Sequence, residues 1–418
     1  MIALVDCNSF FCSVERVFHP GLWNKPVCVL SSNDGIIVAL TPEAKRIGLH
    51  RGDPIFKVRE IVRAYDVAVF SGNMYLYAAM SGRIVSILRK SLVRVENYSI
   101  DESFCYLDGY REPERMMREV AGRIKLWTDI PVSVGIAPSK TLAKMGSKFA
   151  KNYKGYHGVC MIDSDAKRRK ALELFDLADV WGVGGKTYEK LVYCGVRTPL
   201  AFADKSESWV RSRFPKPVYQ TWLELNGVDC IDTMEKIKKQ SISTTRCFGE
   251  MVEDFASLRA SVATFASSVA NKLRAQGSVC SEVSVFVCSN TFRKDLAQYG
   301  NCGSYRFLVP TSDTTEIARA AISILETIYK PGIKYKRSGV WVSGLTDASP
   351  IQLKLFDPVV NRPQRTELMK TMDSLNQRYG LKTVQLAVEG EATQAWKVKS
   401  EHRSPNYLTV LEDILEVE

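Results

Sequence analysis

Long apolar runs are missing from this 418-residue sequence. No segment approaches the ~20 apolar residues of a membrane-spanning helix, and the opening run MIALVD lacks a basic leader and ends at Asp6. The eleven cysteines include no C-x-x-C pair, so a metal ribbon is not indicated, and a chain of this length has enough core without disulfides. Internal repeats and low-complexity tracts are also lacking. These absences predict a cytoplasmic protein with reduced thiols, no signal peptide and no membrane association.

Positive charge is what the chain has in excess. Fifty-seven Lys and Arg residues stand against 46 Asp and Glu residues, a net charge of +11. Hydrophobic content of 45% and charged content of 25% are typical of globular proteins. At ~100–200 residues per domain, the length indicates two to four compact units. The charge favours an anionic partner such as nucleic acid.

Two adjacent carboxylates interrupt an apolar stretch in YSIDESF, residues 98–104. Neighbouring residues of a strand point to opposite faces, so Asp101 and Glu102 cannot both avoid the core unless the chain turns there or a cation binds them. A surface turn is the alternative for any Asp-Glu pair. The strand-like stretches on either side predict a hairpin with the pair near its junction.

An alternating series of strands and helices surrounds this pair. Residues 1–7 are predicted as a buried strand, followed by a helix over NSFFCSVERVF, and later segments complete a split βαββαβ sheet of the ferredoxin-like type. In such a sheet Asp6 could face Asp101 and Glu102. Three converging carboxylates repel one another unless cations neutralise them, and hard oxygen ligands suit Mg²⁺ or Mn²⁺.

Two further segments carry nucleic-acid signals. LADVWGVGGKTYEKLVYCGV places apolar residues around Gly182 and Gly184, as in a helix-hairpin-helix whose backbone N–H groups hold a phosphate. A plain helical hairpin with a glycine turn is the alternative. A charged linker at residues 235–243 precedes a separate α/β unit that runs to about Leu345, and a polar, proline-containing tail follows.

Several motifs stand in a consistent order along the chain. They are D-x-N-x-F-F from Asp6, S-I-D-E at 99–102, G-I-A-P-S-K-T-L-A-K at 135–144, VWGVGGK, RCFGE, QLKLFD and SPNYLTV. Together they resemble the Y-family translesion DNA polymerases, and more narrowly the UmuC type. The resemblance implies an α+β multidomain right-hand fold with a ferredoxin-like palm (1–31 and 75–163), small fingers (32–74), a helical thumb with a helix-hairpin-helix (164–237), an α/β little finger (241–345) and a C-terminal tail (346–418).

The same resemblance implies the chemistry. Asp6, Asp101 and Glu102 match the catalytic carboxylates that hold two Mg²⁺ ions, with Mn²⁺ as a possible substitute, and Cys7 matches a position whose backbone carbonyl also contacts metal. A primer 3′-hydroxyl would attack the α-phosphorus of a dNTP in line, and pyrophosphate would leave. No protein nucleophile is required.

Nucleotide-binding residues are implied in the same way. Phe11 matches the steric gate that excludes a 2′-hydroxyl, a position where Tyr is common. Phe10 lies beside it, with core packing as its rival role. Lys45 and Lys151 match triphosphate contacts, and Pro42 stands where many members of the family place a Tyr.

DNA contacts are expected from Lys140 and Lys144 in a stripe that also includes Lys148 and Lys151, although a solvated helix face is the alternative. Gly182, Gly184 and Arg246 are further expected contacts. Other basic residues of the last unit could grip the backbone: Lys272, Arg274, Arg293, Lys294 and Arg306. Gln352, Leu353, Leu355 and Phe356 resemble the peptide that docks bacterial polymerases on the sliding clamp.

The function predicted is error-prone, template-directed DNA synthesis past damaged bases in the SOS response, in the bacterial cytoplasm and at the nucleoid. The expected partners are primed DNA, the sliding clamp, a UmuD′-like dimer and a RecA filament. Two alternatives stay open: a non-catalytic DNA-bound scaffold at stalled forks, and a palm-domain nucleotide cyclase. The basic last unit and the clamp-like peptide speak against the cyclase, which has no need to hold DNA.

Overall fold

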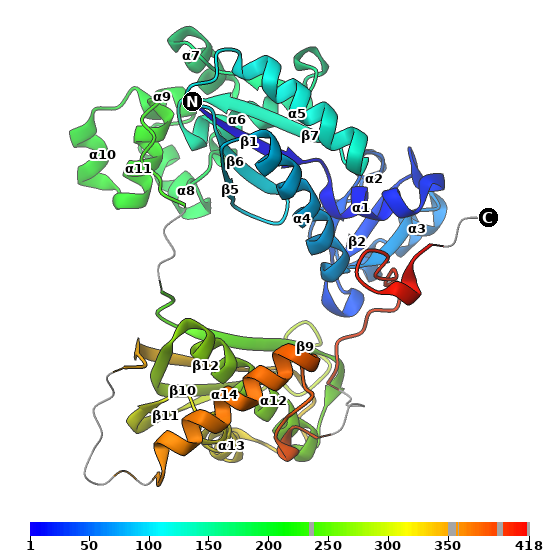
Figure 1. Ribbon diagram of the computed structural model, residues 1–418, viewed down its shortest axis with the longest axis vertical. Coiled ribbons are helices and arrows are strands. Elements are labelled where there is room, and N and C mark those ends of the chain that lie inside the picture. Colours follow the sequence, from blue (N-terminus) through cyan, green and yellow to red (C-terminus); the bar gives the residue numbers. More distant parts are fainter. Residues whose placement is uncertain (234–237, 350–356, 358, 391–395, 416–418) are drawn as a thin grey trace. The chain divides into compact units, whose positions relative to one another are not determined.

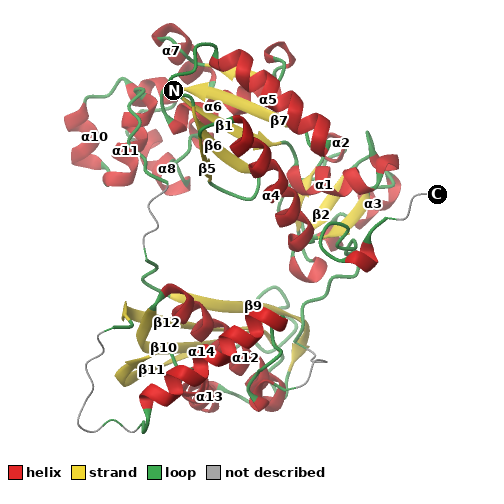
Figure 2. Ribbon diagram, viewed as in Figure 1, coloured by secondary structure: helices red, strands yellow, loops and turns green. Residues whose placement is uncertain are grey.

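The computed structural model describes residues 1–233, 238–349, 357, 359–390 and 396–415. Its contacts divide the chain into two compact units, one formed by residues 1–236 and 401–418 and the other by residues 237–400. Each unit combines sheet and helices (Figures 1 and 2), as expected for an α+β multidomain protein. The boundaries predicted within each unit stay predictions.

The first unit is built around a five-stranded sheet in the order β5-β6-β1-β7-β8. Strand β1 pairs with β6 and β7 antiparallel, and β8 runs parallel to β7. This is the predicted split βαββαβ plan, extended by one edge strand. The elements are β1 (Ile2–Cys7), α4 (Met74–Ser91), β5 (Arg94–Asn97), β6 (Glu102–Tyr106), α5 (Pro113–Thr128), β7 (Val132–Ala137), α6 (Lys140–Asn152) and β8 (Val159–Met161).

Alternation along β1 decides which residues face which helices. Ala3 and Val5 belong to the core formed with α4 and α5, whereas Ile2 and Leu4 belong to the core formed with α6. Asp6 continues the second set. Its side chain therefore lies on the α6 face of the sheet, where that sheet ends.

A small three-stranded sheet is inserted after the helix α1 (Phe10–Phe18). Its order is β3-β2-β4, and it encloses an apolar core of its own. Thr41 caps the first turn of α2 by accepting from the Ala44 N–H at 3.3 Å, and Pro42 occupies the first helical position. The elements are β2 (Val27–Leu30), β3 (Ile37–Leu40), α2 (Pro42–Arg46), α3 (Arg59–Ala64) and β4 (Ala68–Ser71).

Short helices after β8 pack against α6 in the same core. The fully buried Glu224 carboxylate accepts from the Thr141 N–H at 2.8 Å and the Cys230 N–H at 2.9 Å, which ties the start of α6 to this layer. The helices are α7 (Asp165–Leu174), α8 (Gly185–Tyr193), α9 (Pro199–Ala203), α10 (Glu207–Arg213) and α11 (Lys216–Leu225).

The second unit has a four-stranded sheet in the order β11-β10-β12-β9. Helices α12 and α13 supply the core with the inward-facing residues of these strands. A further helix, α14, forms within the predicted tail. The elements are β9 (Ile242–Val252), α12 (Phe255–Gln276), β10 (Ser278–Ser289), β11 (Gly300–Thr311), α13 (Thr314–Ile328), β12 (Tyr335–Asp347) and α14 (Arg362–Tyr379).

The end of the chain returns to the first unit. Arg403 forms a parallel bridge with Ser71 at the end of β4, and the Ser71 N–H donates to the His402 carbonyl at 2.9 Å. The predicted tail is thus divided between the two units. Among the described residues, no helix is both long enough and apolar enough to cross a membrane.

Candidate active site

The acidic residues occupy neighbouring backbone positions where β1 and β6 pair. Asp6 and Glu102 are direct partners in the antiparallel register, and the Cys7 N–H donates to the Asp101 carbonyl at 2.9 Å. Glu102 lies two residues before Phe104, and Asp6 lies two residues after Leu4; Phe104 and Leu4 both belong to the core on the α6 side. Because side chains alternate along a strand, Asp6 and Glu102 lie on that same face. The hairpin between β5 and β6 is confirmed, with Asp101 in its turn.

Helix α6 brings two lysines to this face. Lys144 Nζ lies 2.8 Å from both carboxylate oxygens of Glu102, and Lys151 Nζ lies 3.3 Å from Asp6 Oδ1. The two lysines are seven residues apart, close to two helical turns, and so share one side of the helix. Charge of both signs is therefore concentrated at one edge of the sheet.

Oxygen donors suited to a hard cation are present here. Burial raises the pKa of the Asp6 carboxyl, Lys151 opposes the shift, and Glu102 and Asp101 add to it, so the pKa lies above its ordinary value. A cation would relieve this repulsion. Burial also raises the pKa of the Cys7 thiol, which leaves its backbone carbonyl as the group able to contact a metal.

The carboxylates do not converge on one point. Asp101 accepts from Ser99 Oγ at 2.6 Å, while Glu102 and Asp6 turn to lysines. Within residues 1–233 and the other described ranges, no three Asp, Glu, His or Cys side chains are grouped closely enough to hold a metal ion. The donor chemistry fits a divalent cation, and the lysines supply positive charge to the carboxylates in the present arrangement.

A cavity of about 460 Å³ opens beside these groups. Its lining brings Lys45 of α2 together with Asp6, Glu102 and Lys151; the nucleotide role of Lys45 stays a prediction. Trp181 also lines it, and Lys144 Nζ lies 5.4 Å from the centre of the Trp181 ring. Trp181 was not expected at the site. In the sequence, its position directly before Gly182 is the feature that could have indicated a role for Trp181.

Phe10 and Phe11 lie in different environments. The Phe10 side chain is 3% exposed and belongs to the core, so the packing alternative accounts for the ring, and any nucleotide contact would come from the backbone. The half-buried Phe11 ring stacks on Tyr77, with centroids 4.5 Å apart and planes 16° from parallel. Tyr77 was not expected as a neighbour of the gate.

Burial at the start of α6 corrects one predicted DNA contact, that of Lys140. Lys140 is 3% exposed, and its Nζ donates to the Ile231 carbonyl at 2.6 Å, so it cannot reach a DNA backbone. Lys144 is half-buried and pairs with Glu102, and its DNA contact stays a prediction. Lys148 pairs with Asp179. Acidic or carbonyl partners from distant segments therefore occupy the stripe.

The glycine loop has a structural use as well as a predicted functional one. Gly182 has φ +93°, and a Cβ atom there would lie 2.1 Å from Thr221 Oγ1, so only glycine fits. Gly184 is the N-cap of α8, and a Cβ atom at this exposed residue would meet open space. A phosphate role for Gly184 stays a prediction.

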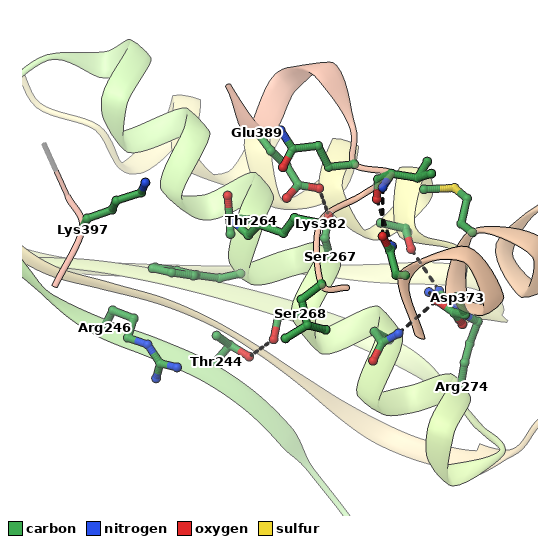
Figure 3. A pocket seen from close by; sticks show the side chains of 18 of the residues that line it. Thr244, Arg246, Thr264, Ser267, Ser268, Arg274, Asp373, Lys382, Glu389 and Lys397 are labelled. Carbon is green, nitrogen blue, oxygen red and sulfur yellow. Dashed lines mark hydrogen bonds and ion pairs between the residues drawn. The ribbon is translucent and has the colours of Figure 1, made fainter. Parts of the chain in front are cut away.

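In the second unit, Arg246 lies beside a cavity of about 490 Å³ (Figure 3). It shares the sheet face of Thr244, whose hydroxyl donates to Ser268 Oγ of α12 at 3.2 Å. Ser267 donates to Glu389 across the same cavity at 2.6 Å. Arg246 therefore projects on the helix side of the edge strand β9, not on the opposite face.

Other predicted cations of this unit are engaged elsewhere. Arg274 pairs with Asp373 at 2.6 Å, Arg293 pairs with Asp295 at 2.6 Å, and Lys272 donates to the Ser243 carbonyl at 3.1 Å. Arg306 and Lys294 are exposed. The clamp-like residues Gln352, Leu353, Leu355 and Phe356 lie outside the described residues.

One sheet face was not anticipated as a functional surface. Alternation sends Thr245, Phe286, Arg337 and Trp341 away from the helices. The Phe286 and Trp341 rings lie 6.1 Å apart, and the Arg337 guanidinium lies 5.3 Å from the Phe286 ring centre. The alternation of these strands could have revealed this face.

Comparison with solved structures defines the class of fold. A Y-family DNA polymerase chimera of Dbh and Dpo4 superposes with a TM-score of 0.65 at 20% identity, over 83% of this chain and 100% of the other. An insertion ternary complex of Dbh DNA polymerase gives 0.52 with the same coverage and identity. The fold is that of a Y-family DNA polymerase.

Sequence comparison identifies the family. The impB/mucB/samB family model matches residues 5–148, its C-terminal domain model matches 239–355, and a domain of unknown function, DUF4113, matches 366–417. Protein UmuC of Salmonella typhimurium is 38% identical over 100% of both chains, and Protein ImpB of the same organism is 37% identical over 99% of both. A DNA polymerase IV of Dehalococcoides mccartyi is 26% identical over 91% of this chain and 95% of its own. The chain belongs to the impB/mucB/samB family, which comprises UmuC-type translesion DNA polymerases.

Proposed function

We propose that this chain performs template-directed, error-prone nucleotidyl transfer past damaged bases, and that the edge of the β1–β6 pair is its active site. The observation that carries the proposal is the register of Asp6 with Glu102 beside the cavity that Lys45 and Lys151 also line. Carboxylates for cations and lysines for a triphosphate thus meet in one cavity of about 460 Å³.

Asp6, Asp101 and Glu102, with the Cys7 carbonyl, are the residues proposed to hold two Mg²⁺ ions, for which Mn²⁺ could substitute. When bound, these cations supply Lewis acidity at the phosphoryl oxygens. Release of Lys144 from Glu102 and of Lys151 from Asp6 would free the carboxylates for this role. Lys151 would then be available for the phosphates of the nucleotide.

The remaining residues bind and orient the dNTP. Lys45 and Lys151 supply positive charge to the triphosphate on the cavity wall. Phe11 is proposed to lie under the sugar, where its ring would exclude a 2′-hydroxyl. Positioning of this kind, without a protein nucleophile, is the main contribution of a protein to phosphoryl transfer.

DNA binding is assigned to the second unit and to the glycine loop. The open sheet face with Arg337, Phe286 and Trp341 offers a cation and aromatic rings, which suit sequence-independent contact with a backbone and its sugars. Arg306 extends this face, since its register partner is Glu282 of β10. Arg246 at the sheet edge, Gly182 and Gly184 are retained as further proposed contacts.

The wider setting follows from the family. We place the activity in the bacterial DNA-damage response, in the cytoplasm at the nucleoid, on primed and damaged DNA. The sliding clamp, through Gln352 to Phe356, a UmuD′-like dimer and a RecA filament are proposed partners. The UmuC and ImpB relatives from a bacterium support this setting.

Primer extension with Mg²⁺ tests the proposal. Replacing Asp101 and Glu102 together with Ala should lower extension by more than about 100-fold, since even outer residues of a metal site contribute up to that factor. DNA binding, measured in parallel by anisotropy, should be unchanged. The control is Glu367→Ala, which removes an exposed carboxylate from the Lys370 pair in α14.

Full extension by the double variant would refute the assigned site. If neither protein extends the primer alone, adding the UmuD′-like dimer and RecA filament decides between an obligate complex and a DNA-bound scaffold. DNA binding without extension under every condition would establish the scaffold. Conversion of a nucleotide to its cyclic form without a template would establish the cyclase.

A further inference from the structure

A segment near the end of the chain packs on β4, α1 and the start of α4 in the first unit. We call residues 401–410 the C-terminal strap. Besides the bridge to Ser71, the strap is held by Asn73, whose Nδ2 donates to the Ser404 carbonyl at 2.8 Å and to the Pro405 carbonyl at 3.3 Å. Tyr407 stacks on Phe18 of α1 with ring centres 4.7 Å apart.

Ser404 connects the strap to a buried carboxylate. The Ser404 hydroxyl donates to Glu15 Oε1 at 3.0 Å, and Glu15, on α1, is fully buried. The Tyr77 hydroxyl donates to the same oxygen at 2.6 Å. Among the described residues, Glu15 Oε2 has no hydrogen-bond partner. Glu15 therefore depends on two hydroxyl donors, one from the strap and one from α4.

Tyr77 contacts both Glu15 and the proposed gate residue Phe11. Its fully buried ring is the surface on which Phe11 stacks at 4.5 Å. The backbone that bears Tyr77 is held by the same strap, because Asn73 is the N-cap of α4 and accepts from the Leu76 N–H at 3.3 Å. Side chain and backbone contacts thus lead from Ser404 to the Phe11 ring.

We propose that the C-terminal strap is a positioning element for sugar selection: Ser404, acting through Glu15 and Tyr77, fixes the Phe11 ring and so sets the discrimination between deoxyribonucleotides and ribonucleotides. The inference rests on the proposed role of Phe11. Ser404 is a positioning residue, since it touches neither nucleotide nor metal ligands. The segment belongs to the part of the chain that matches a domain of unknown function, so the proposal gives that segment a task.

The proposed effect depends on how rigidly the Phe11 ring is held by its neighbours. A steric gate discriminates only if its ring cannot move when a 2′-hydroxyl presses on it, and small displacements of a positioning group alter rates strongly. Removing the Ser404 hydroxyl leaves a buried carboxylate with one donor in place of two. The Glu15 side chain and the Tyr77 ring then gain freedom, and the Phe11 ring loses its fixed support.

The test compares full-length variants in single-nucleotide insertion on a primed template with Mg²⁺, with kcat and KM measured for a dNTP and for the matching ribonucleotide. Ser404→Ala should raise ribonucleotide insertion relative to deoxynucleotide insertion by about 2- to 13-fold, the factor that corresponds to one hydrogen bond. Tyr77→Phe keeps the stacked ring but removes the other donor, and it should act in the same direction.

Two further variants make the comparison specific. Thr409→Ala removes an exposed hydroxyl from the same strap and should leave the selectivity ratio unchanged. Phe11→Ala removes the gate itself and should give the largest loss of selectivity. In Phe11→Ala protein, adding Ser404→Ala should change the ratio no further, because Ser404 acts through the ring that is already absent.

A Ser404→Ala protein with the selectivity of Thr409→Ala overturns the inference. So does a parallel fall in insertion of both nucleotides, which is the mark of a merely structural loss. If Ser404→Ala protein does not fold, as judged by thermal unfolding, Tyr77→Phe decides by the same criteria. Absence of dNTP insertion by the unaltered protein under every condition refutes the proposed function instead, and the inference falls with it.

Discussion

Gly135 of β7 and Gly122 of α5 differ in what a methyl group would meet. A Cβ atom at Gly135 would lie 2.0 Å from the Ala143 carbonyl oxygen and 2.1 Å from the Ser147 nitrogen. The backbones of β7 and α6 therefore touch at this glycine, and this close approach helps to bring the lysines of α6 to the carboxylates of the sheet. At Gly122 a Cβ atom would meet open space.

Gly135→Ala should destabilise the first unit by about 3 kcal/mol or more, since backbone atoms cannot yield as a flexible side chain can. Gly122→Ala, the matched control, should stabilise it by about 0.5–1 kcal/mol because alanine is the better helix former. Urea unfolding of both variants at neutral pH measures the two changes. Equal stability of the two variants would contradict the inferred backbone contact.

The lysines of α6 show how far spacing alone can be interpreted. Their near-helical spacing correctly predicts one shared side of the helix, but it does not reveal that this side is buried at Lys140 and exposed at Lys151. In the structure Lys144, Lys148 and Lys151 each have a carboxylate partner. Those partners lie 31 to 145 residues away in the sequence, so no local pattern could reveal them.

At the scale of elements, ion pairs attach α14 to α13. Arg365 donates to Asp313 through Nε at 2.9 Å and Nη2 at 2.9 Å, and Arg362 lies 3.2 Å from Glu316. Asp313 is also the N-cap of α13, where it accepts from the Thr315 N–H at 2.8 Å. Burial raises the pKa of the Asp313 carboxyl, but the hydrogen bonds from Arg365 and Thr315 outweigh it, so the pKa lies below its ordinary value.

A depressed carboxylate pKa stabilises the folded state above the ordinary value of 3.8, and this stabilisation is lost as the pH falls through the lower folded value. Asp313→Asn should therefore reduce the local stability of α13 and α14 by about 1–3 kcal/mol at pH 7. The difference in local stability between Asp313→Asn and the unaltered protein should become smaller below pH 4. Hydrogen exchange of the α13 and α14 amides, with its intrinsic pH dependence corrected, measures it.

Asp295→Asn is the control, because its pair with Arg293 is exposed and such pairs contribute little. A pH-independent deficit in Asp313→Asn would mean that the charge of Asp313 is not what stabilises this contact.

The local sequence explains which of these elements could be predicted. The β5–β6 hairpin follows from alternation and an Asp-Glu turn, whereas α14 lies in a stretch where polar residues predominate and only Met369 is buried, so its apolar pattern was too weak to indicate docking.

At the scale of the whole molecule, the strap could not be predicted. SPNYLTV has no helical or strand period, and its partners Glu15 and Asn73 are 389 and 331 residues distant from Ser404. The motif was visible as part of the family resemblance but carried no physical interpretation. The contacts of this motif form because the chain leaves the first unit, forms the second unit and then returns to the first.

Deleting residues 401–418 should therefore weaken the first unit at a defined place. The Ser71 N–H loses its bond to His402, and Asn73 loses its contacts to Ser404 and Pro405, so exchange of amides from Ser71 to Tyr77 should rise by about 5- to 30-fold. Amides of α12 and α13 should exchange as before, because their core lies in the other unit. A shorter deletion of residues 414–418, which keeps the strap and the Asp413 carboxylate that accepts from the Asn406 N–H at 2.7 Å, should change neither region. An equal rise in both units would instead make the end of the chain a general stabiliser, without the local attachment to α4 on which the gate depends.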